Sequence, residues 1–166
     1  ANLLNGIVSS FLSDSRNTFD YAVFEVDENA LPGVMLNAKC QMLNTVVVLL
    51  NLFRDQLDRY GEVDTIARNW FTALKKPDKG TTLVINGDDP QLAFIGEKIP
   101  ACLAERESRR AQGRNDNKNV LYFGLDDKKL YLSKMQHATD TIFCPSCGTR
   151  LTFTGVYFSH LGDWKC

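Results

Sequence analysis

Acidic and amide side chains follow three apolar runs of the sequence. The first run ends at Glu25, the second at Asn51 and the third at Asn86. Carboxylate and amide oxygens bind Mg²⁺ and hydrogen-bond nucleotides. If the runs are strands of an open parallel sheet, their carboxyl ends border one ligand crevice, so these side chains would converge there. The runs are 21–24, 46–50 and 83–85.

Each cluster also has an ordinary structural explanation. The acids at 25–28 could lie in a solvated loop, with one of them capping the start of a helix. The charged residues at 54–58 could form surface ion pairs worth under about 1 kcal/mol each. The segment 86–90, Asn-Gly-Asp-Asp-Pro, is a good turn followed by a helix with proline at its first position. The residues concerned in the first two segments are Glu25, Asp27, Glu28, Arg54, Asp55 and Asp58.

Three cysteines near the end of the sequence have the spacing of a zinc site. Cys144 and Cys147 are separated by two residues, and Cys166 follows at the distance expected in a zinc ribbon. Structural zinc takes four donors, so we expect a fourth cysteine three residues beyond Cys166 in a longer parent chain. Within this sequence the possible substitutes are Cys40, Cys102, His137 and His160.

A disulfide or a thioredoxin-like redox pair would use the same cysteines. The cytosolic character of the sequence weighs against a disulfide, and the lack of a strand-to-helix context weighs against a redox pair. We therefore predict structural zinc, bound with roughly 10 to 16 kcal/mol. The metal would stabilise segment 150–164, whose alternating apolar residues predict a hairpin too small for its own core. Cys40 and Cys102 are interpreted as buried thiols.

Alternating strands and helices must position these side chains. Helix 62–75 is the clearest, with an apolar face, Asp64 early, Lys75 late and Pro77 beyond it. The alternation predicts an α/β domain with flanking helices and a mainly parallel sheet. Another expected helix begins at 3 and ends between 13 and 17, two more span 30–39 and 90–97, and the expected strands are 20–26, 45–50, 81–86 and 120–123.

Composition allows one sizeable core and a small satellite module. The chain has 166 residues, 44% of them hydrophobic, and a formal net charge of -1. That charge provides no general attraction to nucleic acid, so we expect no nucleic-acid binding. No apolar run is long enough to indicate a membrane span, and no signal peptide is visible, so we expect a cytoplasmic protein. Segment 105–118 is interpreted as a solvated helix end and loop rather than a phosphate site. Its arginines are Arg106, Arg109, Arg110 and Arg114.

Three segments together resemble the central domain of Mur ligases. They read Phe-Glu-Val-Asp-Glu at 24–28, Asn-Leu-Phe-Arg-Asp-Gln-Leu-Asp at 51–58 and Ile-Asn-Gly-Asp-Asp-Pro at 85–90. The Cys-Pro-Ser-Cys-Gly insertion at 144–148 narrows the resemblance to the MurT branch, the ligase subunits of lipid II isoglutaminyl synthases. The chain then divides into a partial ATP-binding central domain at 1–142 and a partial zinc ribbon at 143–166.

The resemblance implies an ATP-dependent amidation in peptidoglycan synthesis. The α-carboxylate of D-glutamate in the lipid II stem peptide would be phosphorylated, and ammonia from a GatD-like glutaminase subunit would displace the phosphate to give D-isoglutamine. Contact with the membrane would be made only through this lipid-linked substrate. The implied cofactors are ATP, Mg²⁺ and structural Zn²⁺. The implied site residues are Glu25 as a magnesium ligand, Asn51 and Asp55 at the nucleotide and metal site, and Asn86 near the adenine.

Two departures from the family pattern affect these expectations. Gln56 stands where many Mur ligases have a metal-binding histidine, and an amide carbonyl is a weaker ligand. No Gly-x-x-x-x-Gly-Lys-Ser/Thr phosphate loop occurs, and in the family it precedes the point where this sequence begins. The sequence does not begin with Met, so we expect an excerpt that binds ATP poorly alone and whose catalytic residues lie elsewhere.

Two other functions stay open. Another Mur-type or folylpolyglutamate-type ligase would join an amino acid rather than ammonia, and a zinc ribbon within the sheet domain counts against it. A non-catalytic zinc-ribbon module would bind nucleic acid or a protein. Segment 126–166 has five basic and four acidic residues, which is a small positive excess for a protein that binds a phosphate backbone.

Overall fold

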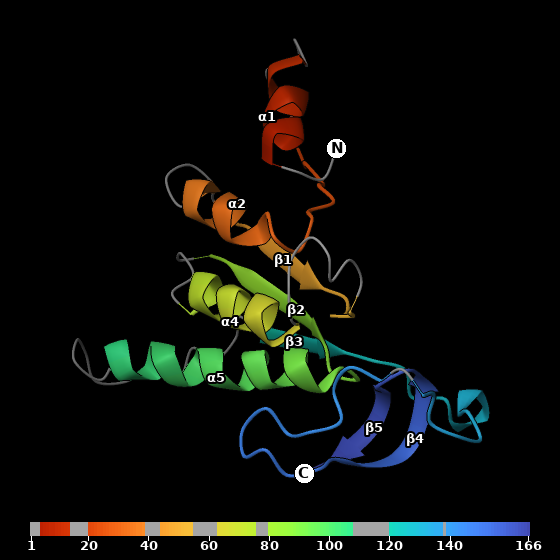
Figure 1. Cartoon of the computed structure of the whole chain (residues 1–166). Coiled ribbons are helices and arrows are strands. Elements are labelled where there is room, and N and C mark those ends of the chain that lie inside the picture. Colours follow the sequence, from red (N-terminus) through yellow and green to blue (C-terminus); the bar gives the residue numbers. More distant parts are fainter. Residues whose placement is uncertain are drawn as a thin grey trace.

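The computed structural model describes residues 4–13, 20–38, 44–54, 63–75, 80–107, 120–137 and 139–166. Figure 1 shows helices stacked over a short sheet, with a hairpin at one end. None of the helices in these ranges is long and apolar enough to cross a bilayer. The elements in order are α1 (Leu4–Ser13), α2 (Leu31–Ala38), β1 (Val46–Leu49), α4 (Val63–Leu74), β2 (Thr82–Asn86), α5 (Pro90–Glu107), β3 (Val120–Phe123), the 3₁₀ helix η1 (Lys128–Leu130), β4 (Thr152–Phe158) and β5 (Leu161–Lys165).

Strands β1, β2 and β3 form a parallel sheet in that order. Leu49 of β1 lies opposite Ile85 of β2, and Asn86 of β2 lies opposite Phe123 of β3. Because the strands are parallel, their carboxyl ends share one edge of the sheet, which we call the carboxyl edge. The prediction of an α/β domain with a mainly parallel sheet is confirmed.

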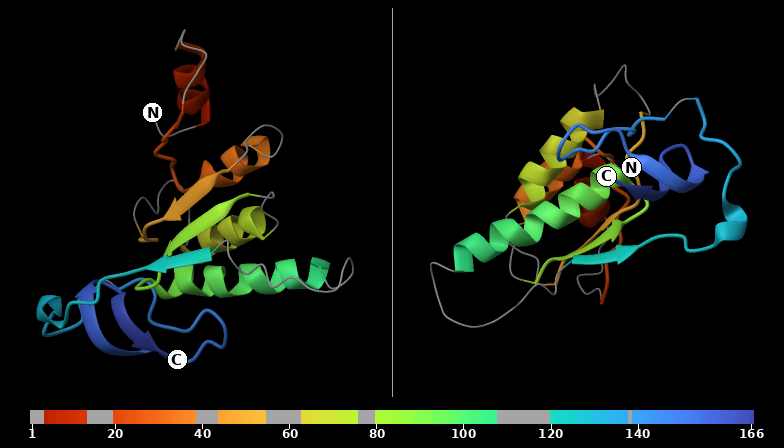
Figure 2. Two further views of the ribbon diagram at one scale, coloured as in Figure 1. Left: turned by 180° about the vertical axis from the view of Figure 1, so that it is seen from behind. Right: turned by 90° about the horizontal axis from the view of Figure 1, so that it is seen from below.

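Helices α2, α4 and α5 cover one face of the sheet (Figure 2). Alternation along β1 sets this arrangement, since Val47 and Leu49 are buried under the helices whereas Val46 and Val48 are 61% and 52% exposed. The face bearing Val46 and Val48 is therefore open in the described part of the chain. The buried core residues are Leu31, Met35, Val47, Leu49, Leu52, Val63, Ile66, Ala67, Trp70, Leu74, Leu83, Ile85, Leu92, Ile95 and Ile99.

Segment 20–26 is extended but is not a strand, so that prediction was wrong. Tyr21 and Val23 are 90% and 94% exposed, and no described strand pairs with the segment. An apolar alternating run becomes a strand only where a neighbour accepts its backbone hydrogen bonds. The chain instead turns at Asp27, whose Oδ1 accepts a hydrogen bond from the Asn29 amide at 3.0 Å. Asp27 thus forms the turn before α2, in agreement with the interpretation of this segment as a loop with an acid near a helix start.

Helix α5 runs to Glu107, well beyond the predicted end at Glu97. The change of composition after 100 had suggested an earlier end. Ile99, one helical turn beyond Ile95, is fully buried like Leu92 and Ile95, so the apolar face that packs on the sheet continues past the predicted end. Arg106 therefore lies in a helix, while Arg109, Arg110 and Arg114 lie outside the described residues.

Strands β4 and β5 form the predicted antiparallel hairpin. Val156 and Tyr157 of β4 are buried, as is Leu151 directly before it. The Tyr157 hydroxyl donates to the Leu125 carbonyl at 2.5 Å, which joins the hairpin to the chain leaving β3. The hairpin also packs against the segment after η1, because the Leu132 amide donates to the Val156 carbonyl at 2.7 Å and the ring centroids of Tyr131 and Tyr157 lie 5.2 Å apart.

Gly96 provides a test of how α5 packs on the sheet. A Cβ at this position would lie 2.5 Å from Tyr122 Oη and 2.9 Å from Ile85 Cδ1. Alanine normally stabilises a helix by about 1 kcal/mol relative to glycine. Overlap in a packed core costs about 1 to 3 kcal/mol, so we expect Gly96→Ala to lower the free energy of unfolding measured in urea.

Tyr122→Phe is the matched background, because it removes the hydroxyl nearest the added methyl group. The cost of Gly96→Ala should shrink in that background. A stabilising Gly96→Ala, or a cost that is identical in both backgrounds, would contradict the close approach of α5 to β3.

Candidate functional site at the carboxyl edge

The end of β1 and the turn after β2 are joined by hydrogen bonds. Asn86 Nδ2 donates to the Leu50 carbonyl at 2.8 Å, and Asn86 Oδ1 accepts from the Asp88 amide at 3.0 Å. The Leu52 amide donates to Asp89 Oδ2 at 2.9 Å. These two strand ends therefore lie side by side at the carboxyl edge, as parallel-sheet geometry predicted.

The other predicted site residues are placed less closely together. Asn51 is exposed at the end of β1, and Glu25 is exposed on the extended segment before Asp27. Among the described residues no three carboxylates or other ligands gather except the cysteines, so the acids at 25–28 do not make a site by themselves. Mg²⁺ commonly takes one or two carboxylates with water and phosphate oxygens, which a single exposed Glu25 fits. Asp55, Gln56 and Asp58 lie outside the described residues.

Asp89 is the buried centre of this edge. Its Oδ1 accepts from the amides of Gln91 at 2.9 Å and Leu92 at 3.3 Å, so Asp89 caps the start of α5. Its Oδ2, already bonded to the Leu52 amide, lies 3.4 Å from His160 Nε2. Both Asp89 and His160 have no exposed surface. One carboxylate thus connects β1, α5 and the hairpin.

The hairpin also binds the backbone of the turn after β2. Trp164 Nε1 donates to the Gly87 carbonyl at 3.1 Å, and the Gly162 amide donates to the Asp88 carbonyl at 3.1 Å. The Asp88 carboxylate in turn accepts from the Leu125 amide at 2.7 Å. The turn that carries Asn86 is therefore held from the hairpin side by several contacts.

The end of β1 is held by the segment that precedes the cysteines. Asp140 Oδ2 accepts from the Arg54 amide at 2.7 Å, and Asp140 Oδ1 lies 3.2 Å from Arg54 Nε. The Phe53 ring centroid lies 5.0 Å from that of His160 and 5.5 Å from that of Phe158. Arg54 thus pairs with a residue far along the chain. Asp55 and Asp58, the nearby acids that the surface-pair explanation considered, lie outside the described residues.

Sequence reasoning missed the roles of Asp89, His160 and Asp140. An aspartate followed by proline at a helix start does indicate a capping residue, so Asp89 had a local signal. His160 was considered only as a substitute zinc ligand, and this was wrong, because its ring is buried against Asp89 and it is not in the cysteine group. No spacing rule links residues 71 positions apart.

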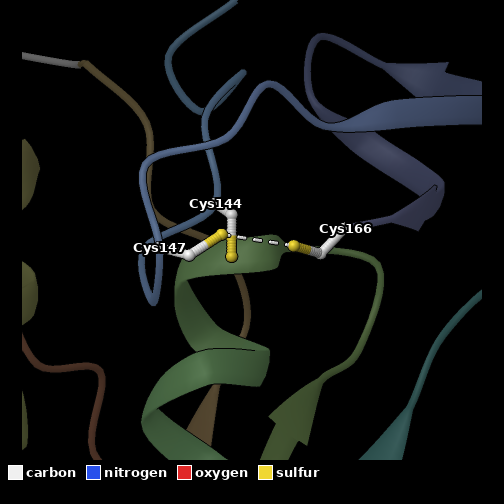
Figure 3. A group of neighbouring side chains, drawn as sticks. All are labelled: Cys144, Cys147 and Cys166. Carbon is white, nitrogen blue, oxygen red and sulfur yellow. Dashed lines mark hydrogen bonds between the residues drawn. The ribbon is translucent and has the colours of Figure 1, made fainter.

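Cys144, Cys147 and Cys166 point toward one another (Figure 3). Their Sγ atoms all lie within 4.8 Å of one another, and those of Cys147 and Cys166 are 3.4 Å apart. Tetrahedral zinc with Zn–S bonds of about 2.3 Å separates sulfurs by about 3.8 Å, so the group fits three corners of such a site. The thiols are free rather than disulfide-bonded. Gly148, with φ of +73°, makes the predicted tight turn beside them.

Hydrogen bonds make two of these thiols unequal. The hydroxyl and the amide of Thr149 lower the pKa of Cys147 to about 7, with Cys166 and Cys144 contributing in the same direction. Cys147 and then Cys144 raise the pKa of Cys166 to about 11. A thiolate at Cys147 near neutral pH is the form that a metal binds.

A fourth ligand is not found among the described side chains. His137 and His160 are not in the cysteine group. Cys40 and the side chain of Cys102 lie outside the described residues. The arrangement is therefore three thiols on one side of a metal position.

The fold and these motifs define a class of protein. Residues 5–154 match the family model of the Mur ligase middle domain. Since this match covers most of the chain, the chain belongs to the Mur ligase middle domain family, as the sequence resemblance indicated. This family comprises ATP-dependent ligases.

Curated relatives refine the comparison. The chain is 28% identical over 168 residues to the lipid II isoglutaminyl synthase (glutamine-hydrolyzing) subunit MurT of Staphylococcus aureus (strain COL). It is 30% identical over 169 residues to the subunit of that name from Streptococcus pneumoniae (strain ATCC BAA-255 / R6). Both alignments cover 100% of this chain and 32% of the relative, so the chain spans about a third of the length of these proteins.

A solved structure supports the fold alone. The pseudomurein peptide ligase type C of Methanothermus fervidus superposes with a TM-score of 0.53 at 23% sequence identity. The match covers 83% of this chain and 22% of that one.

Asp88 provides a pH-dependent test of the carboxyl edge. Burial raises the pKa of Asp88 above its ordinary 3.8, the hydrogen bond from the Leu125 amide opposes this, and Asp163 adds to it. An acid with a raised pKa binds its proton more tightly in the folded state, so the folded protein loses stability as pH rises from below 3.8 through the raised value. Asp88→Asn cannot ionise and can still accept from Leu125.

We therefore expect urea midpoints to shift in favour of Asp88→Asn, relative to the parent protein, between about pH 3 and about pH 7. The exposed neighbour Asp126→Asn is the control and should show no comparable shift. A stability difference between Asp88→Asn and the parent that does not change with pH would contradict the partly buried setting of Asp88.

Proposed function

We propose that the chain is the nucleotide-binding part of the ligase subunit of a lipid II isoglutaminyl synthase. The reaction is the ATP-dependent amidation of the α-carboxylate of D-glutamate in the lipid II stem peptide, with ammonia from a GatD-like glutaminase. It takes place in the cytoplasm during peptidoglycan synthesis. The observation that carries this proposal is that the MurT alignments extend over the entire chain, including the cysteine hairpin beyond residue 154, where the family model ends.

In this proposal the strand ends bind nucleotide and metal. Asn51, exposed at the end of β1, and Asp55 lie at the nucleotide and metal site, and Glu25 is a magnesium ligand. Asn86 lies near the adenine, and its amide group is held in one orientation by the Leu50 carbonyl and the Asp88 amide. Magnesium ATP supplies the phosphoryl group and offsets its charge. The chain's own residues orient that group at the edge of the sheet.

The two chemical steps balance without a redox partner. A carboxylate oxygen of D-glutamate bonds to the terminal phosphorus and ADP leaves, giving an acyl phosphate. Ammonia then bonds to the carbonyl carbon, phosphate leaves with the C–O electrons, and a proton is released from nitrogen. An acyl phosphate hydrolyses in water, so the crevice must exclude solvent. The phosphate loop and the carboxy-terminal catalytic residues of the family would come from other parts of the full-length protein.

Structural zinc is the third cofactor of the proposal. Residues 1–142 form part of the ATP-binding domain, and residues 143–166 form part of a zinc ribbon that binds the metal through Cys144, Cys147 and Cys166. The close approach of the three sulfurs and the low pKa of Cys147 support this assignment. In this proposal the zinc is structural, because a closed site of four protein donors leaves no position for a substrate.

Calorimetric titration of Mg·ATP into the full-length protein tests the nucleotide role. We expect Glu25→Ala to weaken binding on the order of tenfold or more, because a magnesium ligand is lost. Glu97→Ala, an exposed acid on α5, is the matched control and should bind like the parent. Equal affinity in the parent and Glu25→Ala would remove Glu25 from the metal site.

The reaction itself is tested by mass spectrometry of a lipid II analogue incubated with the full-length protein, Mg·ATP and ammonium. Conversion of the D-glutamate carboxylate to an amide supports the proposal. Ligation of an added amino acid instead of ammonia would favour another Mur-type ligase.

Metal analysis tests the zinc assignment. We expect about one zinc per chain in the full-length protein, and loss of most of it in a Cys144→Ser plus Cys147→Ser variant. The exposed Ser146→Ala, in the same loop, is the control. Full zinc content and unchanged thermal stability in the double variant would show that these cysteines do not bind the metal.

A further inference from the structure

The cysteine group joins two parts of the chain that hold different strand ends. Cys144 and Cys147 lie in the loop that begins near Asp140, which we call the loop arm, residues 140–151. Cys166 directly follows β5 and belongs to the hairpin arm, residues 152–166. A metal bound to all three sulfurs would fix the loop arm against the hairpin arm.

The loop arm contacts the end of β1. The Asp140 carboxylate binds both the amide and the guanidinium of Arg54, at 2.7 and 3.2 Å. Arg54 lies three residues beyond Asn51 in the sequence, so this contact reaches the segment that bears Asn51. The position of the β1 end therefore depends on the loop arm.

The hairpin arm contacts the turn after β2. It does so through His160 at Asp89, the Gly162 amide at Asp88 and the Trp164 indole at Gly87. These three residues of the turn directly follow Asn86. The position of Asn86 therefore depends on the hairpin arm.

His160 is a fully buried residue of the hairpin arm. Among the described side chains of that arm, it alone contacts both Phe53, after β1, and Asp89, after β2. Its Nε2 faces Asp89 Oδ2, the atom that also accepts the Leu52 amide. A carboxylate only accepts hydrogen bonds, so Nε2 carries the hydrogen in this pair. The other face of the ring packs against Phe53, directly after Leu52. Loss of His160 would leave Asp89 with a buried oxygen short of one donor.

We propose that His160 is a positioning residue that couples the cysteine metal centre to the nucleotide edge: through Asp89 it fixes the end of β1 against the turn bearing Asn86. Zinc binding and Mg·ATP binding are then linked, because zinc holds the two arms that set this spacing. The inference rests on the proposed function. It assigns to the ribbon a task in nucleotide binding and not only in stability.

The test compares three variants of the full-length protein. His160→Phe fills the site but cannot donate to Asp89. His160→Gln keeps an N–H near the place of Nε2. His137→Phe is the matched control, because His137 is the other histidine of the chain and is exposed.

We expect His160→Phe to keep its zinc and to bind Mg·ATP about three- to tenfold more weakly than the parent. His160→Gln should recover most of the affinity, and His137→Phe should match the parent. Stripping zinc from the parent with a chelator should weaken Mg·ATP binding in the same range. Unchanged affinity in zinc-loaded His160→Phe, or after zinc removal, would overturn the proposal.

Two further variants, Leu74→Ala and Asp140→Ala, distinguish a general loss of stability from the loss of a positioning contact. Leu74→Ala opens the core at the far end of α4, away from the carboxyl edge, and should lower thermal stability without the same loss of affinity. If His160→Phe does not fold, Asp140→Ala removes the loop-arm contact at the protein surface and should weaken Mg·ATP binding instead. An affinity loss in Leu74→Ala equal to that of the His160 or Asp140 variant would refute a positioning role.

Hydrogen exchange keeps this test independent of the proposed function. The Leu52 amide should exchange faster in His160→Phe and after zinc removal, while the Ile85 amide within β2 should not change. If the full-length parent binds no nucleotide, the proposed function fails, and Leu52 exchange still decides whether the cysteine module is coupled to β1. Unchanged Leu52 exchange in the variant and in the zinc-free parent would refute the coupling.

Discussion

The buried carboxylate of Asp89 is the contact on which the site depends. It caps α5, accepts the Leu52 amide at the end of β1 and meets His160 from the hairpin. A fully buried acid is costly unless its oxygens are satisfied, so these elements cannot move apart without exposing an unpaired charge. The apolar core places β1 and α5 against each other, and the Asp89 carboxylate adds the hairpin to them at the strand ends that bear Asn51 and Asn86.

Local patterns were enough to predict most elements, and long-range pairing accounts for the failures. The apolar face of α4 and the runs at 46–49 and 82–86 read correctly because helix and strand periodicity are local properties. Segment 20–26 has the same apolar character, yet it is not a strand, because a strand also needs a partner. The convergence of two strand ends followed from parallel-sheet geometry. His160 and Asp140 could not be predicted, since their partners lie far away in the sequence.

Residues 140–166, which carry the three cysteines, contact the ends of both β1 and β2 in the Mur ligase sheet. The hairpin among these residues contacts the turn after β2 and so lies at the carboxyl edge, where this fold class binds ligands (Figure 1). With zinc bound as proposed, the cysteine group would provide a fixed support for residues that must hold a charged group in one geometry. That support is the role we propose for the cysteine group at this position of the fold.

A crystal structure of the full-length protein with a non-hydrolysable ATP analogue and Mg²⁺, recorded at the zinc absorption edge, tests the central claim most directly. The account predicts an anomalous peak among the sulfurs of Cys144, Cys147 and Cys166, and nucleotide density at the carboxyl edge beside Asn51 and Asn86. It also predicts an intact contact between His160 and Asp89. Nucleotide bound on another surface, or cysteines without metal, would contradict it.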